Sequence, residues 1–413
     1  MAIQGLISTG DIETSDANER PKNWRQGILM RFPNGHAPIT ALTSKMKKKV
    51  TDDPQFNWWE REVSNVRLQL GSNAGTGNSL TTLADPFGFG GSEQVKSGDL
   101  LYAEETGELM LATADGAADG LTLTVSRSWG ATVATTVLFA TENPNLVIVG
   151  SVYAESSDTP ESVRYRATRF YNYTQIFRNS LKASRTAMQT RLRTMEEVRD
   201  AKQQALLYHS ISMEYAFIFG EKVEDTSGAE PRRSTGGIIS RIPSANIVDK
   251  LGAAVSWDEY EDIMLEAFRF GSQEKMAFCG NRAILAIQRA IRHADAVSVE
   301  LTPATKEFGM DVRRLFTPYG TVVLKSHPLF NQITSTPGAG NEYFSFDTWM
   351  MIVDMADLTY RPLRNSDTQY LPDRQANGVD GLTSEYLTEA GLEVNHGKHH
   401  FLVKGLYLGG DEP

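Results

Sequence analysis

The chain has 413 residues, of which 40% are hydrophobic and 22% are charged, an ordinary composition for a soluble protein of two or three domains. Its formal net charge of −10 is unevenly placed: residues 71–162 hold two basic and twelve acidic side chains, whereas residues 163–233 hold thirteen basic and eight acidic ones. No strongly basic patch interleaved with aromatic residues occurs, so a nucleic-acid-binding signature is absent from the sequence. We expect the acidic segment to face solvent, away from any polyanion.

The single cysteine, Cys279, lies in an apolar context, so it excludes an intrachain disulfide and is predicted to be a buried, inert thiol. The N-terminus has neither a basic start nor a continuous apolar core, and no run of about 18 apolar residues occurs in the chain. We therefore expect no signal peptide and no membrane-spanning helix, and synthesis in the cytoplasm.

Residues 1–50 are predicted to form an arm without a core of its own, because their apolar residues are scattered among Gly, Ser, Thr, Asp and Asn. Residues 38–49 are expected to form two helical turns that end in a basic cluster. The cluster consists of Lys45, Lys47, Lys48 and Lys49. Two interpretations stay open: a solvated helix end, or a contact with phosphate or with carboxylates of a neighbouring subunit.

The aromatic-rich stretch from Phe56 to Val63 is typical of the start of a strand. Trp58 and Trp59 would point to opposite faces of it, so one is expected in a core and the other is a candidate interface anchor. Residues 71–150 are rich in Gly, Thr, Ser and acidic residues, and turn residues separate their short β-type runs, which predicts a small antiparallel sheet or barrel. The runs cover residues 100–103, 108–112, 121–125 and 146–149.

The stretch from Glu161 to Phe219 contains neither Gly nor Pro, the strongest breakers of regular structure. From about Ser180, apolar residues recur at steps of three, four and seven, with polar residues on the other face. The pattern predicts one helix of roughly 40 residues, about 60 Å long, with other elements packed along it. Its end, from Tyr208, is apolar nearly all round and is expected to be buried. Strict heptads do not persist, which disfavours a coiled coil.

From Asn246 the pattern is mixed α/β. Ser256 and Glu259 form a capping box that is expected to open a helix to about Phe270, and Asn281 is expected to cap the next helix. The tail contains the stretches 358–361 and 385–394, and strands are predicted at residues 275–279, 315–317, 321–325, 349–353 and 401–407. The last of these is expected to close a sheet under the long helix.

No catalytic constellation is evident: the metalloprotease, nucleophile-elbow and phosphate-loop patterns and paired cysteines are absent. His396, His399 and His400 are the candidates for a metal or enzyme site. Their neighbours are a turn and a strand, and no Cys or acidic ligand stands at a metal-site spacing, so an exposed turn is the preferred interpretation. His209 is interpreted as a core histidine with satisfied hydrogen bonds. We assign no catalytic residue, cofactor or metal.

Three stretches carry a resemblance to a known family. They are residues 38–45 leading to 56–60, the acidic residues 98–132, and the tail 385–394. Together with the order of the parts, they make most of the chain resemble the tailed-bacteriophage major capsid (coat) proteins of the Hong Kong 97-type fold. The resemblance implies an α+β fold with a long spine helix, an extended β loop that carries a small β insertion, and an α/β axial domain.

The resemblance also implies a division of the chain. Residues 1–55 would be an N-terminal arm, 56–170 the extended loop with the acidic β insertion at about 71–150, 171–240 the peripheral domain with the spine helix, 241–355 the axial domain, and 356–413 the return to the peripheral-domain sheet. The Lys–Asn cross-link of some family members cannot be matched to residues here.

The implied function is that of a structural protein, not an enzyme, which self-assembles as pentamers and hexamers into an icosahedral phage head around double-stranded DNA. The implied location is the virion, after synthesis in the host cytoplasm. Expected partners are further copies of the chain, portal and separate scaffolding proteins, a decoration protein, and packaged DNA through nonspecific, salt-sensitive contacts; no membrane is expected. The candidate subunit-interface residues are Trp58, Trp59, Lys45, Lys47, Lys48 and Lys49.

Three alternatives are weighed against this function. The first is an encapsulin-like cellular nanocompartment shell of the same fold, which would enclose cargo protein. The second is an enzyme that uses His396, His399 and His400. The third is a tail or fibre protein, which is disfavoured because neither sequence repeats nor a trimeric coiled-coil pattern occurs.

Overall fold

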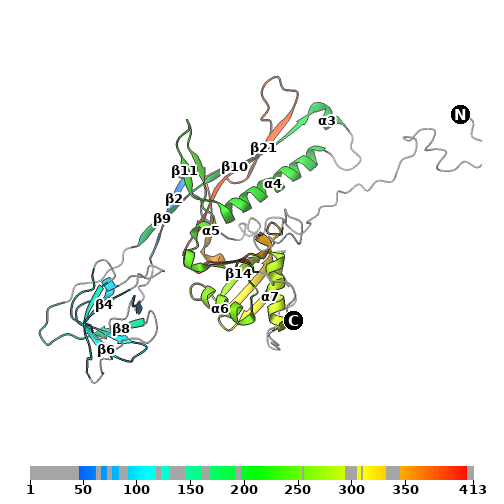
Figure 1. The fold of residues 1–413 in the computed structure, drawn as a ribbon. Helices are drawn as coiled ribbons and strands as arrows, with labels where there is room; N and C mark the ends of the chain where they lie inside the picture. Colours follow the sequence, from blue (N-terminus) through cyan, green and yellow to red (C-terminus); the bar gives the residue numbers. More distant parts are fainter. Residues whose placement is uncertain are drawn as a thin grey trace, which may run out of the picture.

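The computed structural model describes residues 46–61, 67–71, 77–82, 92–117, 122–130, 145–159, 167–190, 197–253, 255–293, 305–307, 310–331 and 345–406. Helices and strands are mixed along these ranges, as the expected α+β class requires. Figure 1 shows a small β body joined by a two-stranded ribbon to a larger body of helices and sheets. None of the helices in the described ranges is long and apolar enough to cross a membrane.

The small body is a six-stranded antiparallel sheet, and the four β-type runs predicted between residues 71 and 150 are four of its strands. In spatial order it comprises β3 (Arg67–Gln69), β8 (Asn145–Ser151), β5 (Asp99–Ala103), β6 (Leu109–Ala112), β7 (Thr122–Ser126) and β4 (Ser79–Thr81). Side chains such as Leu80, Leu101 and Met110 form a core of its own beneath the sheet. Alternate residues of these strands point inward, which is why short alternating runs identified them.

A ribbon of two antiparallel strands connects this insertion to the rest of the chain. The strands are β2 (Gln55–Glu60) and β9 (Thr168–Tyr173), and each residue of one has a partner on the other. The larger body begins where β9 gives way to β10 (Gln175–Ser184).

The helix predicted from Ser180 to Phe219 is wrong in its first part. Residues 175–184 form β10, which pairs antiparallel with β21 (Gly381–Val394) over ten residue pairs. A short helix, α3 (Arg185–Gln189), follows, with Ser184 as its N-cap, and the long helix α4 spans only Glu197–Phe219, 23 residues. Phe177 and Leu181 are both buried, and a spacing of four fits a strand as well as a helix. Pairing with a strand two hundred residues away decided between the two.

A five-stranded sheet lies beside α4. Its order is β1 (Lys47–Lys48), β19 (Leu358–Pro362), β21 and β10, and β20 (Gln369–Leu371) also pairs with β21. The C-terminal part of α4 is buried, as predicted: Met213, Phe217 and Ile218 pack in one core with residues of this sheet. Tyr208, at the start of the apolar stretch, is instead 60% exposed.

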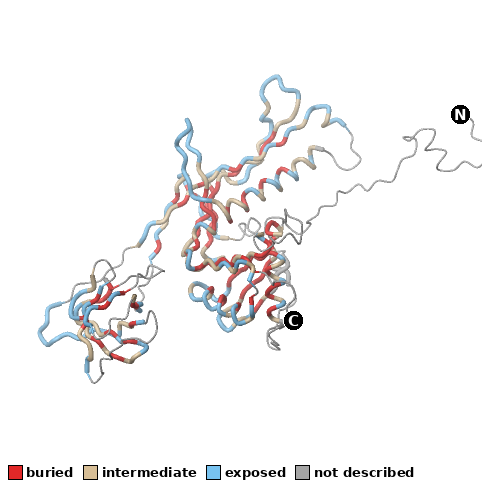
Figure 2. Tube along the Cα trace, viewed as in Figure 1, coloured by how far each residue is buried: buried red, intermediate tan, exposed pale blue. Residues whose placement is uncertain are grey.

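A seven-stranded mixed sheet forms the other half of the larger body. In spatial order it comprises β13 (Ile247–Asp249), β22 (Phe401–Lys404), β18 (Met350–Val353), β14 (Glu274–Cys279), β17 (Gly320–Ser326), β16 (Met310–Thr317) and β15 (Thr305–Glu307). Figure 2 shows its central strands buried. Side chains alternate between two cores: Met276 and Phe278 face the core around α4, whereas Ala277 and Cys279 face helices α6 (Trp257–Ala267) and α7 (Asn281–His293).

The sheet includes one strand that was expected elsewhere. The prediction that residues 401–407 close a sheet under the long helix is wrong, because β22 pairs with β13 and β18 instead. The strand that lies beside β10, next to α4, is β21. Both segments are apolar and β-rich, so composition alone did not distinguish their partners.

Two helix starts were predicted in this half of the chain. The capping box at Ser256 and Glu259 is confirmed, and α6 ends at Ala267 rather than near Phe270. Asn281 is not a cap: it is the first residue of α7, and its own backbone N–H donates to Asn331 Oδ1 at 2.7 Å. Cys279 is buried, as predicted, and burial raises the pKa of its thiol.

Candidate functional site: the anchor of the β2–β9 ribbon

The two tryptophans of β2 lie on opposite faces of the ribbon, as predicted. Trp58 stands opposite Phe170 and is half buried, with 6.3 Å between the ring centres. Trp59 stands opposite Arg169 and is 67% exposed. Neither indole is in a closed core: Trp58 lines a pocket, and Trp59 presents its ring to solvent.

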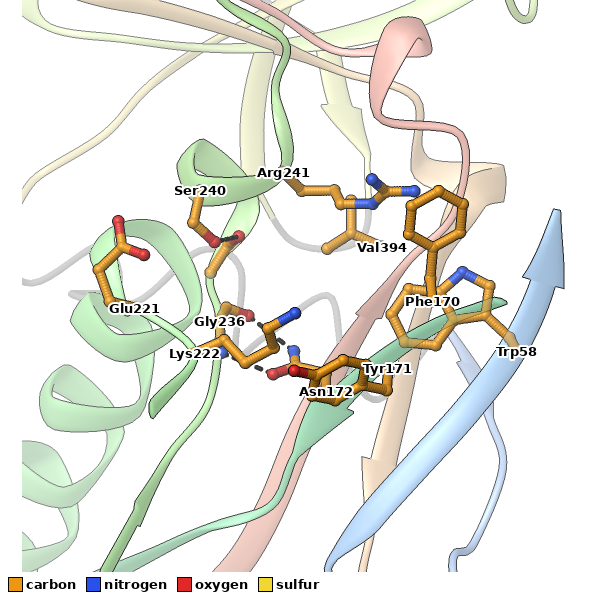
Figure 3. Close-up of a pocket in the computed structure, with 11 residues that line it drawn as sticks. Trp58, Phe170, Tyr171, Asn172, Glu221, Lys222, Gly236, Ser240, Arg241 and Val394 are labelled. Atoms are coloured by element: carbon orange, nitrogen blue, oxygen red, sulfur yellow. Dashed lines mark hydrogen bonds between the residues drawn. The ribbon is translucent and has the colours of Figure 1, made fainter. Parts of the chain in front are cut away.

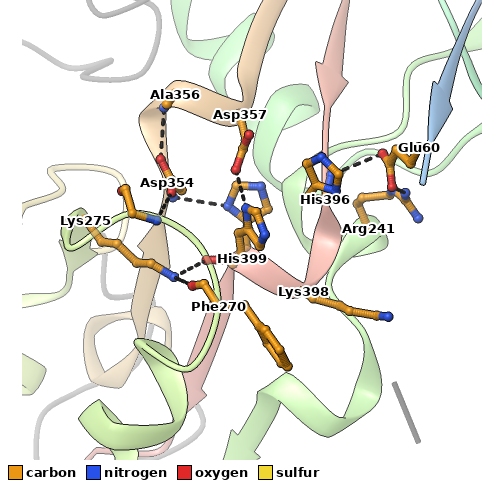
Figure 4. A network of polar contacts seen from close by, with 12 residues as sticks. Glu60, Arg241, Phe270, Lys275, Asp354, Ala356, Asp357, His396, Lys398 and His399 are labelled. Atoms are coloured by element: carbon orange, nitrogen blue, oxygen red, sulfur yellow. Dashed lines mark hydrogen bonds and ion pairs between the residues drawn. The ribbon is translucent and has the colours of Figure 1, made fainter. Parts of the chain in front are cut away.

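Glu60, the last residue of β2, is a buried carboxylate that joins three distant segments. It accepts hydrogen bonds from Trp58 Nε1 at 2.7 Å, from Arg241 Nη2 at 2.7 Å and from the backbone N–H of His396 at 3.1 Å. The guanidinium of Arg241 also stacks on Phe170, 3.7 Å from the ring centre. Figure 4 shows Glu60 between Arg241 and His396. An ion pair with Arg241 and two hydrogen bonds from neutral donors, all to the Glu60 carboxylate, therefore hold the ribbon in its direction.

Asn172 anchors the end of β9 that is nearest to the larger body. Its amide nitrogen donates to Gly236 O at 2.9 Å and Leu392 O at 2.8 Å, and its amide oxygen accepts from the backbone N–H of Gly236 and Tyr173. The side chain is 5% exposed. All its polar atoms are thus satisfied by backbone groups, which holds the ribbon against β21 and the segment that leads into α5 (Ile238–Arg241).

A pocket of about 300 Å³ opens beside these anchors (Figure 3). Its lining comprises Trp58, Phe170, Tyr171, Asn172, Glu221, Lys222, Gly236, Gly237, Ser240, Arg241 and Val394. Three aromatic rings come from the ribbon, and the charged side chains come from the body. The ammonium of Lys222 lies 3.8 Å from the centre of the Tyr171 ring. Such a mixture of π faces and a cation suits a ligand with an acidic group beside apolar surface.

The lysine cluster is not at the end of a helix where the structure describes it. Lys47 and Lys48 form β1, which runs parallel to β19, so the prediction of a helical turn is wrong there. Lys48 forms an ion pair with Asp367, and Lys47 Nζ reaches Ala356 O at 3.4 Å. Lys49 is exposed, and Lys45 lies outside the described residues. Pairing with an edge strand requires extended backbone, and that tertiary contact overrode the local pattern.

The histidine segment is not an exposed turn, so that interpretation is wrong. His396 has a left-handed backbone (φ 45°) and stacks on His399, whereas His400 is fully buried. His399 Nδ1 lies 2.6 Å from Asp357 Oδ2, and Asp354 lies in the same network (Figure 4). Ligand atoms of Asp354, Asp357 and His399 lie within 4.8 Å of one another. Sequence spacing missed the two aspartates because they precede the histidines by about forty residues.

Hydrogen bonds already engage Asp354 and Lys275 in this network. Asp354 accepts from the backbone N–H of Ser272 at 2.8 Å and of Ala356 at 3.1 Å. The buried Lys275 donates to three carbonyl oxygens, those of Ala267, Phe270 and His399, at 2.6–2.8 Å. Burial lowers the pKa of Lys275 to about 8, and the two nearby aspartates oppose the shift. The positive charge of Lys275 in this network disfavours the binding of a divalent cation there. The hydrogen bonds of Lys275 join β14, the end of α6 and the histidine segment.

His400 makes the stability of this junction sensitive to acid. Its Nδ1 accepts the Asp354 N–H at 3.2 Å, and burial lowers its pKa from 6.5 to about 4. The fold therefore keeps the ring neutral, and its contribution is complete above pH 6.5 and lost as the pH falls toward 4. Between pH 7 and pH 5 we expect this residue to lower the free energy of unfolding by about 2 kcal/mol.

The measurement is urea unfolding at the two pH values. His400→Gln should show a pH difference smaller than that of the wild type by this amount. His396→Asn is the matched control, because asparagine tolerates the left-handed backbone, and it should keep the wild-type difference. An equal pH difference in His400→Gln and in the wild type would contradict the assignment.

His209 is a core histidine, as predicted. Both of its ring nitrogens are hydrogen-bonded, to Asn179 and to Thr388.

The described residues thus form anchors and junctions that hold an exposed ribbon to the larger body. The family model of the SU10 major capsid protein matches residues 9–407, so the chain belongs to that family. It is a phage major capsid protein, a shell-forming component of the virion, and the expected resemblance to major capsid proteins is confirmed. A curated relative, a major capsid protein of Pseudomonas phage PaMx41, is 25% identical over 332 residues, covering 77% of this chain and 75% of that protein.

Solved structures show weaker likenesses. The capsid of a native GTA particle is 10% identical, with a TM-score of 0.45, and the match covers 98% of this chain and 100% of that one. The holo-SrpI encapsulin complex from Synechococcus elongatus PCC 7942 is 9% identical, with a TM-score of 0.41, and the match covers 62% and 80%. These values do not distinguish a phage shell from an encapsulin shell, so the family match is what favours the phage shell.

Proposed function

We propose that copies of this chain assemble as pentamers and hexamers into an icosahedral head, of Hong Kong 97-type subunits, that encloses double-stranded DNA. The observation that carries the proposal is the β2–β9 ribbon. Glu60 and Asn172 fix its direction from the larger body, yet it leaves Trp59 67% exposed. An ordered ribbon that exposes the Trp59 indole is expected to be covered by a neighbouring copy, because aromatic side chains are typical anchors of interfaces.

The proposal includes a role for each part of the chain. Residues 1–55 act as an arm, 56–170 as the extended loop with its insertion, and 171–240 with the first part of 356–413 as the peripheral domain. Residues 241–355 act as the axial domain around the five-fold and six-fold positions, together with β22, which pairs within their sheet. The acidic insertion faces outward, where a decoration protein binds, and the mildly basic residues 163–233 face the DNA. Portal and scaffolding proteins complete the head, and synthesis takes place in the host cytoplasm.

Electron microscopy of the full chain, expressed alone and with its neighbouring genes, tests the proposal. We expect closed particles whose absorbance spectrum shows nucleic acid when packaging genes are present. Particles that hold protein cargo and no nucleic acid would favour the encapsulin-like alternative. Monomers in every sample would refute assembly.

Trp59→Ala is expected to impair assembly without destabilising the subunit. The indole is exposed, so the urea midpoint should not move, whereas loss of a contact worth about 2 kcal/mol raises the concentration needed for shells about 30-fold. Light scattering against protein concentration measures the effect. Tyr208→Ala, at a similarly exposed ring on α4, is the control and should assemble normally. Wild-type assembly by Trp59→Ala would remove this residue from the interface, and the same test applies to Lys45, Lys47, Lys48 and Lys49. For Trp58, the substitution also removes the hydrogen bond to Glu60, so assembly is compared with the measured change in the urea midpoint.

A further inference from the structure

The pocket beside the ribbon contains a cation that lacks an acidic partner. Lys222 is exposed, lies over Tyr171, and within the described ranges has no carboxylate at ion-pair distance. Arg241, on the far wall, is neutralised by Glu60, yet its Nε is buried without a hydrogen-bond partner. Glu221, the one carboxylate in the lining, lies across the pocket from Phe170 and Trp58 (Figure 3). The aromatic side of the pocket therefore presents positively charged hydrogen-bond donors and no carboxylate.

The insertion carries the complementary group. Several of its described carboxylates are already engaged: Asp99 by the Lys96 N–H, Glu104 by Arg67, Glu108 by Arg127 and Asp115 by Lys96. Glu155 and Asp158 differ, because they are exposed and have neither a hydrogen bond nor an ion pair with any described residue. They follow Val152 and Tyr153, each 41% exposed. Residues 152–158 thus present apolar surface next to unpaired carboxylates.

We propose that the pocket binds residues 152–158 of a second copy of this chain, with the Glu155 carboxylate on Lys222. The composition of the segment matches that of the pocket, acid to cation and apolar side chains to aromatic rings, and about 300 Å³ admits a few side chains. Within one chain, β8 ends the insertion at Ser151, and Figure 1 places β8 at the far end of the ribbon from α5 and β11 (Val223–Asp225). The partner is therefore a neighbour, and the proposal rests on the assembly function above.

A disulfide between the two sites tests the contact directly. In the full chain, Lys222→Cys combined with Glu155→Cys should give covalent multimers on a non-reducing gel after mild oxidation of assembled particles. Cys279 is buried, so the native thiol does not compete. Each single variant should stay monomeric, and so should the control Lys182→Cys with Glu155→Cys, since Lys182 is an exposed lysine on β10. Absence of multimers, or a disulfide within one chain, would overturn the proposal.

A charge exchange supplies an independent readout. Lys222→Glu should raise the concentration needed for assembly at least tenfold while leaving the urea midpoint unchanged, because the side chain is exposed. Adding Glu155→Lys should restore assembly. Normal assembly of Lys222→Glu, or no recovery in the double variant, would overturn the proposal. If the wild type itself forms no particles, the assembly function fails instead, so the two failures are distinguishable.

Discussion

Glu60→Ala is expected to lower the free energy of unfolding by about 3 kcal/mol and to abolish shell formation. The carboxylate is 6% exposed and accepts from Trp58, Arg241 and the His396 backbone. Its removal leaves three donors without their acceptor, and the guanidinium of Arg241, which is 26% exposed, without a counter-charge. The cost is set near the lower end of the range for buried ion pairs because Arg241 retains some contact with water.

Urea unfolding and hydrogen exchange of the β2 and β9 amides measure the two effects. Faster exchange should be limited to the ribbon and should not spread into the larger body. The reason is that Asn172 still anchors the end of β9 that is nearest to the larger body. Glu104→Ala is the matched control: its ion pair with Arg67 is exposed, so we expect a loss below about 1 kcal/mol and normal shells. Normal assembly of Glu60→Ala would show that the direction of the ribbon is set by other contacts.

Glu108→Ala is expected to cost about 3–5 kcal/mol in the stability of the insertion. Arg127 donates two hydrogen bonds to this carboxylate, from Nε at 2.7 Å and from Nη2 at 2.6 Å, and the backbone N–H of Ser128 donates a third at 3.1 Å. The two side chains are 1% and 5% exposed, so solvent cannot replace the lost charge. The truncation therefore removes the carboxylate that faces a buried guanidinium, within a small body that has its own core.

Hydrogen exchange of β5 to β8 measures this loss locally, whereas the amides of β14 and β17 should keep their protection. Lys96→Ala, which removes the more exposed pair with Asp115, should change protection little. The double variant Glu108→Met with Arg127→Met should recover much of the stability, because apolar replacement removes both charges together. A double variant no more stable than Glu108→Ala would mean that the stability comes from the ion pair itself and is not recovered by removing the buried charge of Arg127.

The sequence by itself determined the features that depend on local pattern. Alternation and turn residues located four of the six strands of the insertion, and the Ser256 capping box located α6. The apolar context of Cys279 predicted its burial. The order of the segments, together with three sequence stretches, predicted the family that the chain belongs to. In each case the determining interactions lie within a few residues of each other, so the pattern is visible without the fold.

The tertiary structure decided whatever depends on partners distant in sequence. Residues 175–184 became β10 because β21 was available to pair with them, although their spacing also fitted a helix. Glu60 acquired its role from Arg241 and His396, and His399 its aspartate from the segment before β19. A buried carboxylate must find donors wherever the chain brings them, and sequence spacing does not encode those long-range distances.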